Sequence, residues 1–144
     1  VQQKILFNSM ESTFSSFNAT TFAQNTMDQL AATRHAIQRK NKFELYNNCS
    51  KPLSDFVMEC LESNYPLPFD HQFDFSSVEI IKIAKYVSDN DVQTSSRTWY
   101  QLQLLFRSSK HPNFLKAVTE RRECDLEENS WRFSDFSTDN IPIK

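Results

Sequence analysis

The most restrictive feature of this sequence of 144 residues is that it contains no glycine. Phosphate-binding loops, dinucleotide fingerprints, nucleophile elbows and calcium loops need glycine, because only a residue without Cβ adopts positive φ freely or lets backbone amides touch a ligand. The sequence therefore excludes most familiar enzyme motifs. The absence of glycine also favours helices, since no interior position carries the penalty of roughly 1 kcal/mol that glycine imposes relative to alanine.

The size and the aromatic content of the chain indicate one domain with its own core. A chain of this length buries roughly 70% of its unfolded surface on folding, and thirteen phenylalanines supply much of the apolar area. The apolar runs are shorter than the ~18 residues of a transmembrane helix, so we expect no membrane association. The formal charge of −2 and the pI near 5.9 argue against a dedicated nucleic-acid binder.

The cysteines, histidines and glycosylation motifs limit the chemistry further. Cys49, Cys60 and Cys124 are odd in number and scattered, which favours reduced thiols in a nuclear or cytoplasmic protein. The three histidines have no partners at metal-ligand spacing, so we expect no metal and no cofactor. No nucleophile motif is visible, and the chain is predicted not to be an enzyme. Glycosylation sequons at Asn18 and Asn48 leave a secreted helical bundle as a third reading.

The first half of the chain reads as helical. Residues 1–25 form an aromatic N-terminal arm or helix in this reading, and residues 26–136 form a single helical domain. Thr26-Met27-Asp28-Gln29 resembles a capping box that begins a helix reaching about Asn41. Pro52 suits the first turn of the clearest core helix, whose apolar positions then follow helical spacing. Those positions are Leu53, Phe56, Val57, Cys60 and Leu61.

The second half also shows helical spacing at first. A capping box at 76–79 and the spacing of Val78, Ile81, Ala84 and Val87 predict a helix over 76–87. Similar spacing predicts helices over 99–106 and 112–118. Apolar residues then alternate with polar ones over 124–133, which predicts a small β-hairpin, and 137–144 reads as a disordered tail. The expected fold is mainly α: a helical domain of about five helices with a small C-terminal β-hairpin.

Residues 99–136 resemble the SPK domain, a nematode module associated with SET, PHD and kinase proteins. The matching pattern is an aliphatic-Leu-Phe helix end followed by serine, then Phe-Leu, an acidic stretch alternating with apolar residues, and an aromatic finish. It stands here as Leu104-Leu105-Phe106, Ser108-Ser109, Phe114-Leu115, Val118, Glu123-Cys124-Asp125-Leu126-Glu127 and Trp131-Arg132-Phe133. Lys110-His111-Pro112 replaces the usual Pro-Val of the family, and the loop there is shorter. The resemblance implies a small, mostly helical module of a nuclear or chromatin regulatory protein, with no catalytic residues.

The excess of aromatic residues favours a protein-binding function. The loop between Asn64 and Phe75 carries several rings, and exposed rings serve as anchors in protein interfaces. We therefore predict a non-enzymatic protein–protein interaction module of a nuclear, chromatin or germline regulatory protein. Its partner would be another protein, and a homodimer through the N-terminal arm is a further option. The predicted protein-binding residues are Tyr65, Phe69, Phe73 and Phe75.

A basic helix face supplies the alternative function. Cationic and polar side chains recur on adjacent turns between residues 34 and 42, which would present a surface able to track phosphates. The alternative is a DNA- or RNA-binding helical domain that uses this face. The residues predicted for nucleic-acid binding are Arg34, His35, Gln38, Arg39 and Lys42.

Overall fold

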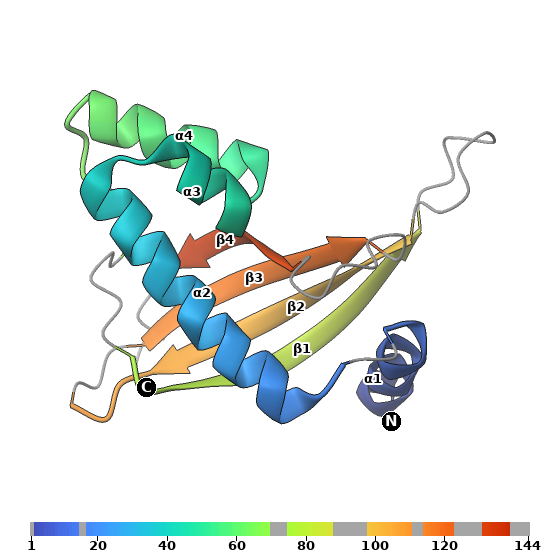
Figure 1. Ribbon diagram of the computed structural model, residues 1–144. Helices are drawn as coiled ribbons and strands as arrows, with labels where there is room; N and C mark the ends of the chain where they lie inside the picture. Colours follow the sequence, from blue (N-terminus) through green and yellow to red (C-terminus); the bar gives the residue numbers. More distant parts are fainter. Residues whose placement is uncertain are drawn as a thin grey trace, which may run out of the picture.

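A computed structural model shows a four-stranded antiparallel sheet with helices packed against one of its faces (Figure 1). It describes residues 2–14, 17–69, 75–87, 98–110, 114–122 and 131–138. Within these residues the helices come first, as α1 (Gln2–Thr13), α2 (Ala19–Arg39), α3 (Lys42–Asn48) and α4 (Lys51–Glu62). The strands follow as β1 (Ser77–Val87), β2 (Thr98–Arg107), β3 (Phe114–Arg122) and β4 (Arg132–Ser137). The predicted mainly α fold of about five helices with a small C-terminal hairpin is therefore wrong, and the fold is a mixed α/β one.

The strands lie in the sheet in their order along the chain, β1-β2-β3-β4. Each strand pairs antiparallel with the next, so Leu102 on β2 lies opposite Ile83 on β1 and opposite Thr119 on β3. A β-bulge interrupts the β1–β2 pairing between Ile80 and Lys82. α2 crosses one face of the sheet, α1 lies beside β1, and α3 and α4 lie next to β4 (Figure 1).

The helix ends are set by local capping. The Asn18 side chain accepts hydrogen bonds from two backbone N–H groups in the first turn of α2, and Lys40 ends this helix in the left-handed conformation at φ 53°. α2 therefore begins well before the predicted capping box, whose Thr26 is buried inside the helix. α4 begins as predicted, with Pro52 in its first turn, and the structure adds Ser50 as its N-cap.

The segment predicted as a helix over 76–87 is strand β1. Its side chains that face the helices are Val78 and Ile80 before the bulge and Ile83 after it, opposite the buried face of β2. The bulge inserts one residue and changes the spacing from two to three, which imitates a helical period. The β-branched residues in this segment favour a strand over a helix, and tertiary pairing decides in their favour.

The helices predicted over 99–106 and 112–118 are strands β2 and β3. Tyr100, Leu102, Leu104 and Phe106 alternate along β2 and are fully buried. Leu105 faces the other side of the sheet and is also apolar, so the alternation is hidden in the sequence. The buried face of β3 contains polar residues, including Thr119 and Arg121, which obscures its period of two.

The second arm of the predicted C-terminal hairpin is a strand in the structure, but it pairs with β3. Phe133 lies in β4 opposite Thr119, so β4 pairs with β3. The other predicted arm, around Cys124 and Leu126, lies outside the described residues. β4 ends at Ser137, the first residue of the predicted tail, and residues 139–144 also lie outside the described part.

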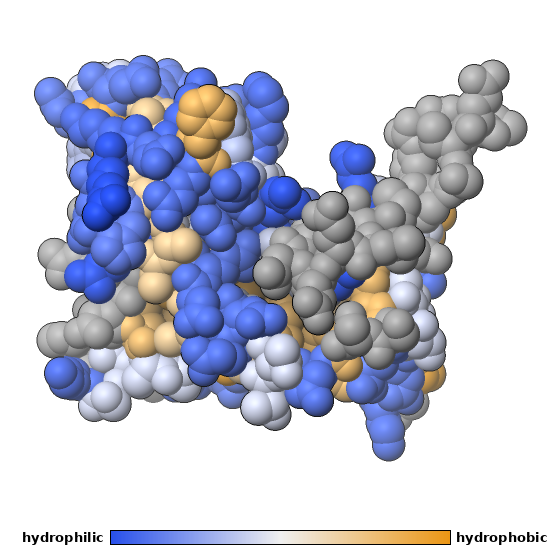
Figure 2. Space-filling view, viewed as in Figure 1, coloured by the Kyte–Doolittle hydropathy of each residue, from blue (hydrophilic) through white to orange (hydrophobic). Residues whose placement is uncertain are grey.

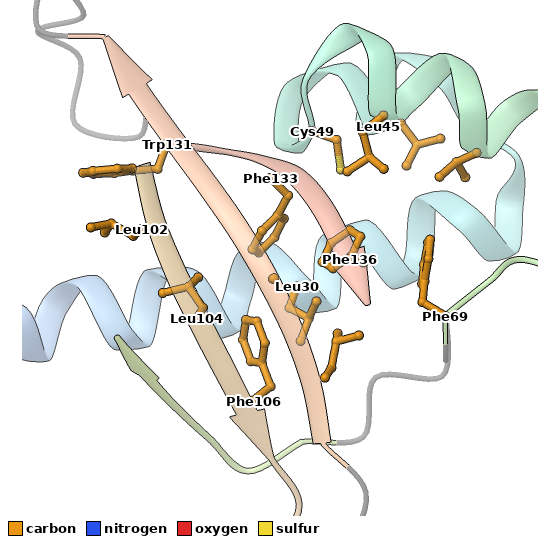
Figure 3. Close-up of a cluster of buried hydrophobic side chains, with 14 of the residues drawn as sticks. Leu30, Leu45, Cys49, Phe69, Leu102, Leu104, Phe106, Trp131, Phe133 and Phe136 are labelled. Atoms are coloured by element: carbon orange, nitrogen blue, oxygen red, sulfur yellow. The ribbon is translucent and has the colours of Figure 1, made fainter. Parts of the chain in front are cut away.

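The core lies between α2 and the inner face of the sheet (Figure 3). Leu30 on α2 and Leu104 on β2 are both almost completely buried. Phe133 lies 6.3 Å from Phe106 and 4.9 Å from Phe136, measured between ring centroids. These rings on β2 and β4 pack together in the layer between the sheet and α2.

The helix-bearing side of the sheet is largely hydrophilic, with apolar patches beside α2 (Figure 2). On the opposite side, Tyr86 and Trp99 stack with centroids 5.4 Å apart. None of the described helices has the length and apolar composition that a bilayer crossing requires.

Candidate functional site

The described residues form a groove with a cavity volume of about 340 Å³. It lies between the N-terminal half of α2, the end of α3, and the segment that enters β4. Its α2 wall follows one helix face, because Thr21, Asn25, Asp28 and Ala32 recur at helical spacing. Ligand pockets in proteins commonly fall in a range of roughly 300–1,000 Å³, so the groove is large enough for a side chain or a small molecule.

Aromatic rings form the apolar part of the groove. Phe17, Phe22 and Trp131 line it. Phe22 lies 5.3 Å from Phe17 and 5.5 Å from Trp131 between ring centroids, and the contact with Trp131 is edge-on at 76°. Since Phe22 and Trp131 are buried, the rings support one another and give the groove a fixed wall.

Gln29 holds the polar part of the groove together. Its Nε2 donates hydrogen bonds to the carbonyl of Asn48, at 3.0 Å, and to the carbonyl of Trp131, at 2.6 Å. One side chain on α2 thereby joins the last residue of α3 and the residue before β4. The groove depends on this connection because its walls come from segments far apart in the sequence.

Two side-chain amides on the rim, unlike that of Gln29, make no hydrogen bond within the described residues. Asn25 and Asn47 are exposed, and in the described part of the chain neither side chain makes a hydrogen bond to the protein. Each carboxamide offers both a donor and an acceptor. The rim therefore presents hydrogen-bonding groups that are available to a ligand.

Arg121 places a cation at the inner end of the groove. Its residue is only 5% exposed, and its guanidinium carbon lies 4.0 Å from the centroid of the Phe14 ring. An arginine stacked on a ring at this distance is held by a cation–π interaction. Asp28 is the other ionisable residue of the lining, so the groove is mainly neutral and polar.

The described residues offer no reactive centre at this groove. Its lining contains no cysteine or histidine, and no cluster of metal-ligating side chains occurs in the described ranges. Burial raises the pKa of the nearby Cys49 thiol to about 12, against a smaller lowering by its contact with Thr33. A thiol with so high a pKa stays protonated and is a poor nucleophile.

The structure separates the predicted protein-binding aromatics. Tyr65 is 70% exposed in the segment after α4. Phe69 is buried and lies 5.1 Å from the Phe136 ring, and Phe75 is half-buried against Phe106. Phe73 lies outside the described residues. Of the three described rings, Tyr65 is the one that is mainly accessible to a partner.

The residues predicted for nucleic-acid binding lie away from the groove, near the end of α2 and the start of α3. His35, Gln38 and Arg39 are exposed, and Arg34 is half-buried. Lys42 is engaged elsewhere: its Nζ lies 4.0 Å from an Asp55 carboxylate oxygen and 5.6 Å from the centroid of the Tyr46 ring. The exposed members therefore form a smaller basic surface than predicted.

The groove residues were not identified from the sequence. One signal is present, because Thr21, Asn25 and Asp28 give the first half of α2 a polar face at a spacing of three or four residues. The other wall could not be inferred, since Trp131 meets this face only through folding of the sheet.

Comparison of the chain with protein-family models, with curated proteins and with solved structures finds no match. The resemblance to the SPK domain stays a prediction. Residues 99–136, which carry it, contain most of β2, all of β3 and most of β4.

Proposed function

We propose that the protein is a non-enzymatic binding module that takes an extended segment of a partner protein into the groove beside α2. The observation that carries the proposal is that the groove combines an aromatic wall with two rim amides, Asn25 and Asn47, that make no side-chain hydrogen bond within the described residues. The resemblance to the SPK domain supports a setting in a nuclear or chromatin regulatory protein. Cys49 and Cys60 are free, buried thiols, which supports a reducing compartment, the nucleus or the cytoplasm.

The rim amides suit a peptide backbone. An extended peptide segment presents alternating N–H and C=O groups, and a carboxamide pairs with both at once. Asn25 and Asn47 stand on different helices, so a segment running between them is contacted from two sides. Few charges line the groove, which favours recognition of the neutral backbone over recognition of a strongly charged group.

The aromatic wall suits an apolar side chain of the same segment. A side chain that enters the cavity would pack against Phe17, Phe22 and Trp131. Such anchors contribute much of the affinity at protein interfaces because they are fully removed from water. The expected ligand is therefore a short extended segment with one apolar or aromatic anchor.

A second candidate function is nucleic-acid binding through the exposed part of the basic surface at the end of α2. His35 and Arg39 are exposed there, and neither has an ion pair within the described ranges. This surface is separate from the groove, so the two functions are distinguished by mutations at different places.

The test is a selection of binding peptides from a displayed random library with the immobilised protein, followed by affinity measurement on purified variants. Asn25→Lys places a long charged side chain in the groove. Gln24→Lys adds the same charge one residue earlier, at an exposed position outside the lining. We expect Asn25→Lys to weaken peptide binding at least about tenfold, which corresponds to ~1.4 kcal/mol, and Gln24→Lys to leave it unchanged.

Two results would contradict the proposal. One is a selection that yields no saturable peptide, and the other is equal loss of binding in both variants. A labelled single-stranded oligonucleotide tests the second candidate. Its binding, lost in Arg39→Glu and retained in Asn25→Lys, would make nucleic-acid binding the better description of the function.

A further inference from the structure

The side chain of Gln3 reaches from α1 to the open edge of strand β1. Its Nε2 donates a hydrogen bond to the Ile83 carbonyl at 3.1 Å, and the Ile83 N–H donates to its Oε1 at 2.7 Å. A side-chain amide in this arrangement presents the same donor and acceptor as a peptide group. Gln3 therefore occupies the place that one residue of an added neighbouring strand would take.

Within the described residues β1 is an edge strand, because β2 is the one strand hydrogen-bonded to it there. Backbone groups alternate between the two sides of a strand, so Lys85 and Val87 direct their N–H and C=O groups to the same open side as Ile83. The opposite edge is better covered. There the backbone of Cys49 forms an isolated parallel β-bridge with Phe133, and the Ser50 N–H donates to the Phe133 carbonyl at 2.7 Å.

Several features of β1 oppose pairing with another strand. The bulge after Ile80 distorts the edge. Lys85 faces the inner side of the sheet, with its Nζ 5.6 Å from the centroid of the Tyr100 ring. Bulges, inward-facing lysines and covering side chains are the devices by which natural sheets prevent edge-to-edge association. A strand rich in isoleucine needs them, since Ile80, Ile81 and Ile83 give it high β-propensity.

The rest of α1 holds Gln3 in position. Met10 and Phe14 are buried, and Ser9 Oγ lies 2.9 Å from the Tyr100 hydroxyl. The residues that anchor this helix therefore lie in its second half and directly after it, whereas Gln3 is in the exposed first turn. Removal of the Gln3 amide would release the edge of β1 without releasing the helix.

We propose that the β1 edge is a latent strand-addition site for the β1 edge of a second copy of this chain, and that Gln3 blocks it. A two-fold axis at Ile83 sets this residue opposite its own copy. Each Ile83 would then donate to and accept from the other, through the atoms that Gln3 now uses. In that register Lys85 lies at the backbone position opposite Ile81 of the second copy, and Lys82 lies opposite Ala84, so like charges are not placed opposite one another.

Sedimentation velocity over a range of protein concentrations tests the proposal. Gln3→Ala removes both hydrogen bonds, and Gln2→Ala removes a neighbouring exposed amide as the matched control. We expect Gln3→Ala to dimerise at least about tenfold more tightly than the wild type, equivalent to ~1.4 kcal/mol, and Gln2→Ala to match the wild type. Adding Lys85→Pro to Gln3→Ala removes an edge N–H and should restore the monomer.

Amide hydrogen exchange keeps the test decisive if the variants differ in stability. The Ile83 N–H should be protected in the wild type and exchange faster in dilute monomeric Gln3→Ala, while its neighbours on β2 keep their protection. A folded Gln3→Ala that stays monomeric at every concentration would overturn the proposal. A wild type that is already dimeric, or a dimer that persists with Lys85→Pro, would overturn it as well.

Discussion

Gln29 allows a direct test of how the groove is built, because this one side chain joins α2 to two other segments. The perturbation is Gln29→Met, which keeps the length of the side chain and a similar helix propensity but removes the amide. Both hydrogen bonds, to the carbonyls of Asn48 and Trp131, are then lost. The change isolates the polar contribution because little packing volume is removed.

The expected magnitude follows from the count of lost hydrogen bonds. A net contribution of about 1 kcal/mol for each of two hydrogen bonds gives a loss of ~2 kcal/mol in the free energy of unfolding. The carbonyls of Asn48 and Trp131 belong to partly buried surroundings, so incomplete replacement by water would move the value towards ~3 kcal/mol. For a domain of this size, a loss of ~2 kcal/mol lowers Tm by roughly 4–8 °C.

Urea denaturation followed by circular dichroism measures this loss, with Gln24→Met as the control. Gln24 is on the same helix, and its Nε2 donates to Asp28 at an exposed site. Exposed pairs of this kind contribute only a few tenths of a kcal/mol. If Gln29→Met loses no more stability than Gln24→Met, then Gln29 does not hold the groove together and the reasoning fails.

Three further predictions concern other parts of the chain. Phe133→Ala empties a fully buried position and should cost roughly 3–5 kcal/mol in urea denaturation; a loss below ~1 kcal/mol would contradict the core described above. Hydrogen bonds from Tyr46, and then from Lys51, hold the pKa of Asp55 below its ordinary value of 3.8. The stability that these hydrogen bonds give to the folded state is present above pH 3.8 and is lost as the pH falls through the lowered pKa. The urea midpoints of the wild type and Asp55→Asn should therefore differ at neutral pH and coincide in acid. When a signal peptide directs the chain into the secretory pathway, a glycosidase-sensitive mass shift should depend on Asn18, whose side chain is exposed, and not on Asn48, whose Nδ2 donates to a backbone carbonyl; a shift lost in Asn48→Gln would refute this.

The features predicted correctly from the sequence are those encoded locally. The start of α4 is predicted correctly because Pro52 acts within the first turn of the helix that it begins. α2 ends at Arg39, close to the predicted end near Asn41. The start of α2 was missed, because Asn18 competes with a convincing capping box at Thr26 and the longer helix buries more surface.

The sheet was missed because its pattern depends on pairing between distant segments. The bulge after Ile80 hides the alternation of β1, and Leu105 on the outer face hides that of β2. On β3 the inner positions include Arg121, which is buried through its stacking on Phe14. A buried arginine reads as a surface residue in the sequence, so its contact with a ring more than a hundred positions earlier could not be anticipated.

α1 connects the two proposed sites, and this connection gives a last prediction. Gln3 in its first turn is hydrogen-bonded to the β1 edge. Phe14, directly after the helix, lies 5.8 Å from the Trp131 ring between centroids and stacks under Arg121, and both of these residues line the groove. Because Met10 and Phe14 anchor this helix independently of Gln3, the Gln3→Ala monomer should bind a selected peptide as tightly as the wild type.

Phe14→Leu is the contrasting variant. It removes the ring that contacts Trp131 and Arg121. We expect it to weaken peptide binding while the amide of Gln3 remains in place. Titration of one labelled peptide into both variants, at concentrations where each is monomeric, measures the difference. If Gln3→Ala weakens binding as much as Phe14→Leu does, then α1 moves as one body, and pairing at the edge would be coupled to the groove through the aromatic contacts of Phe14.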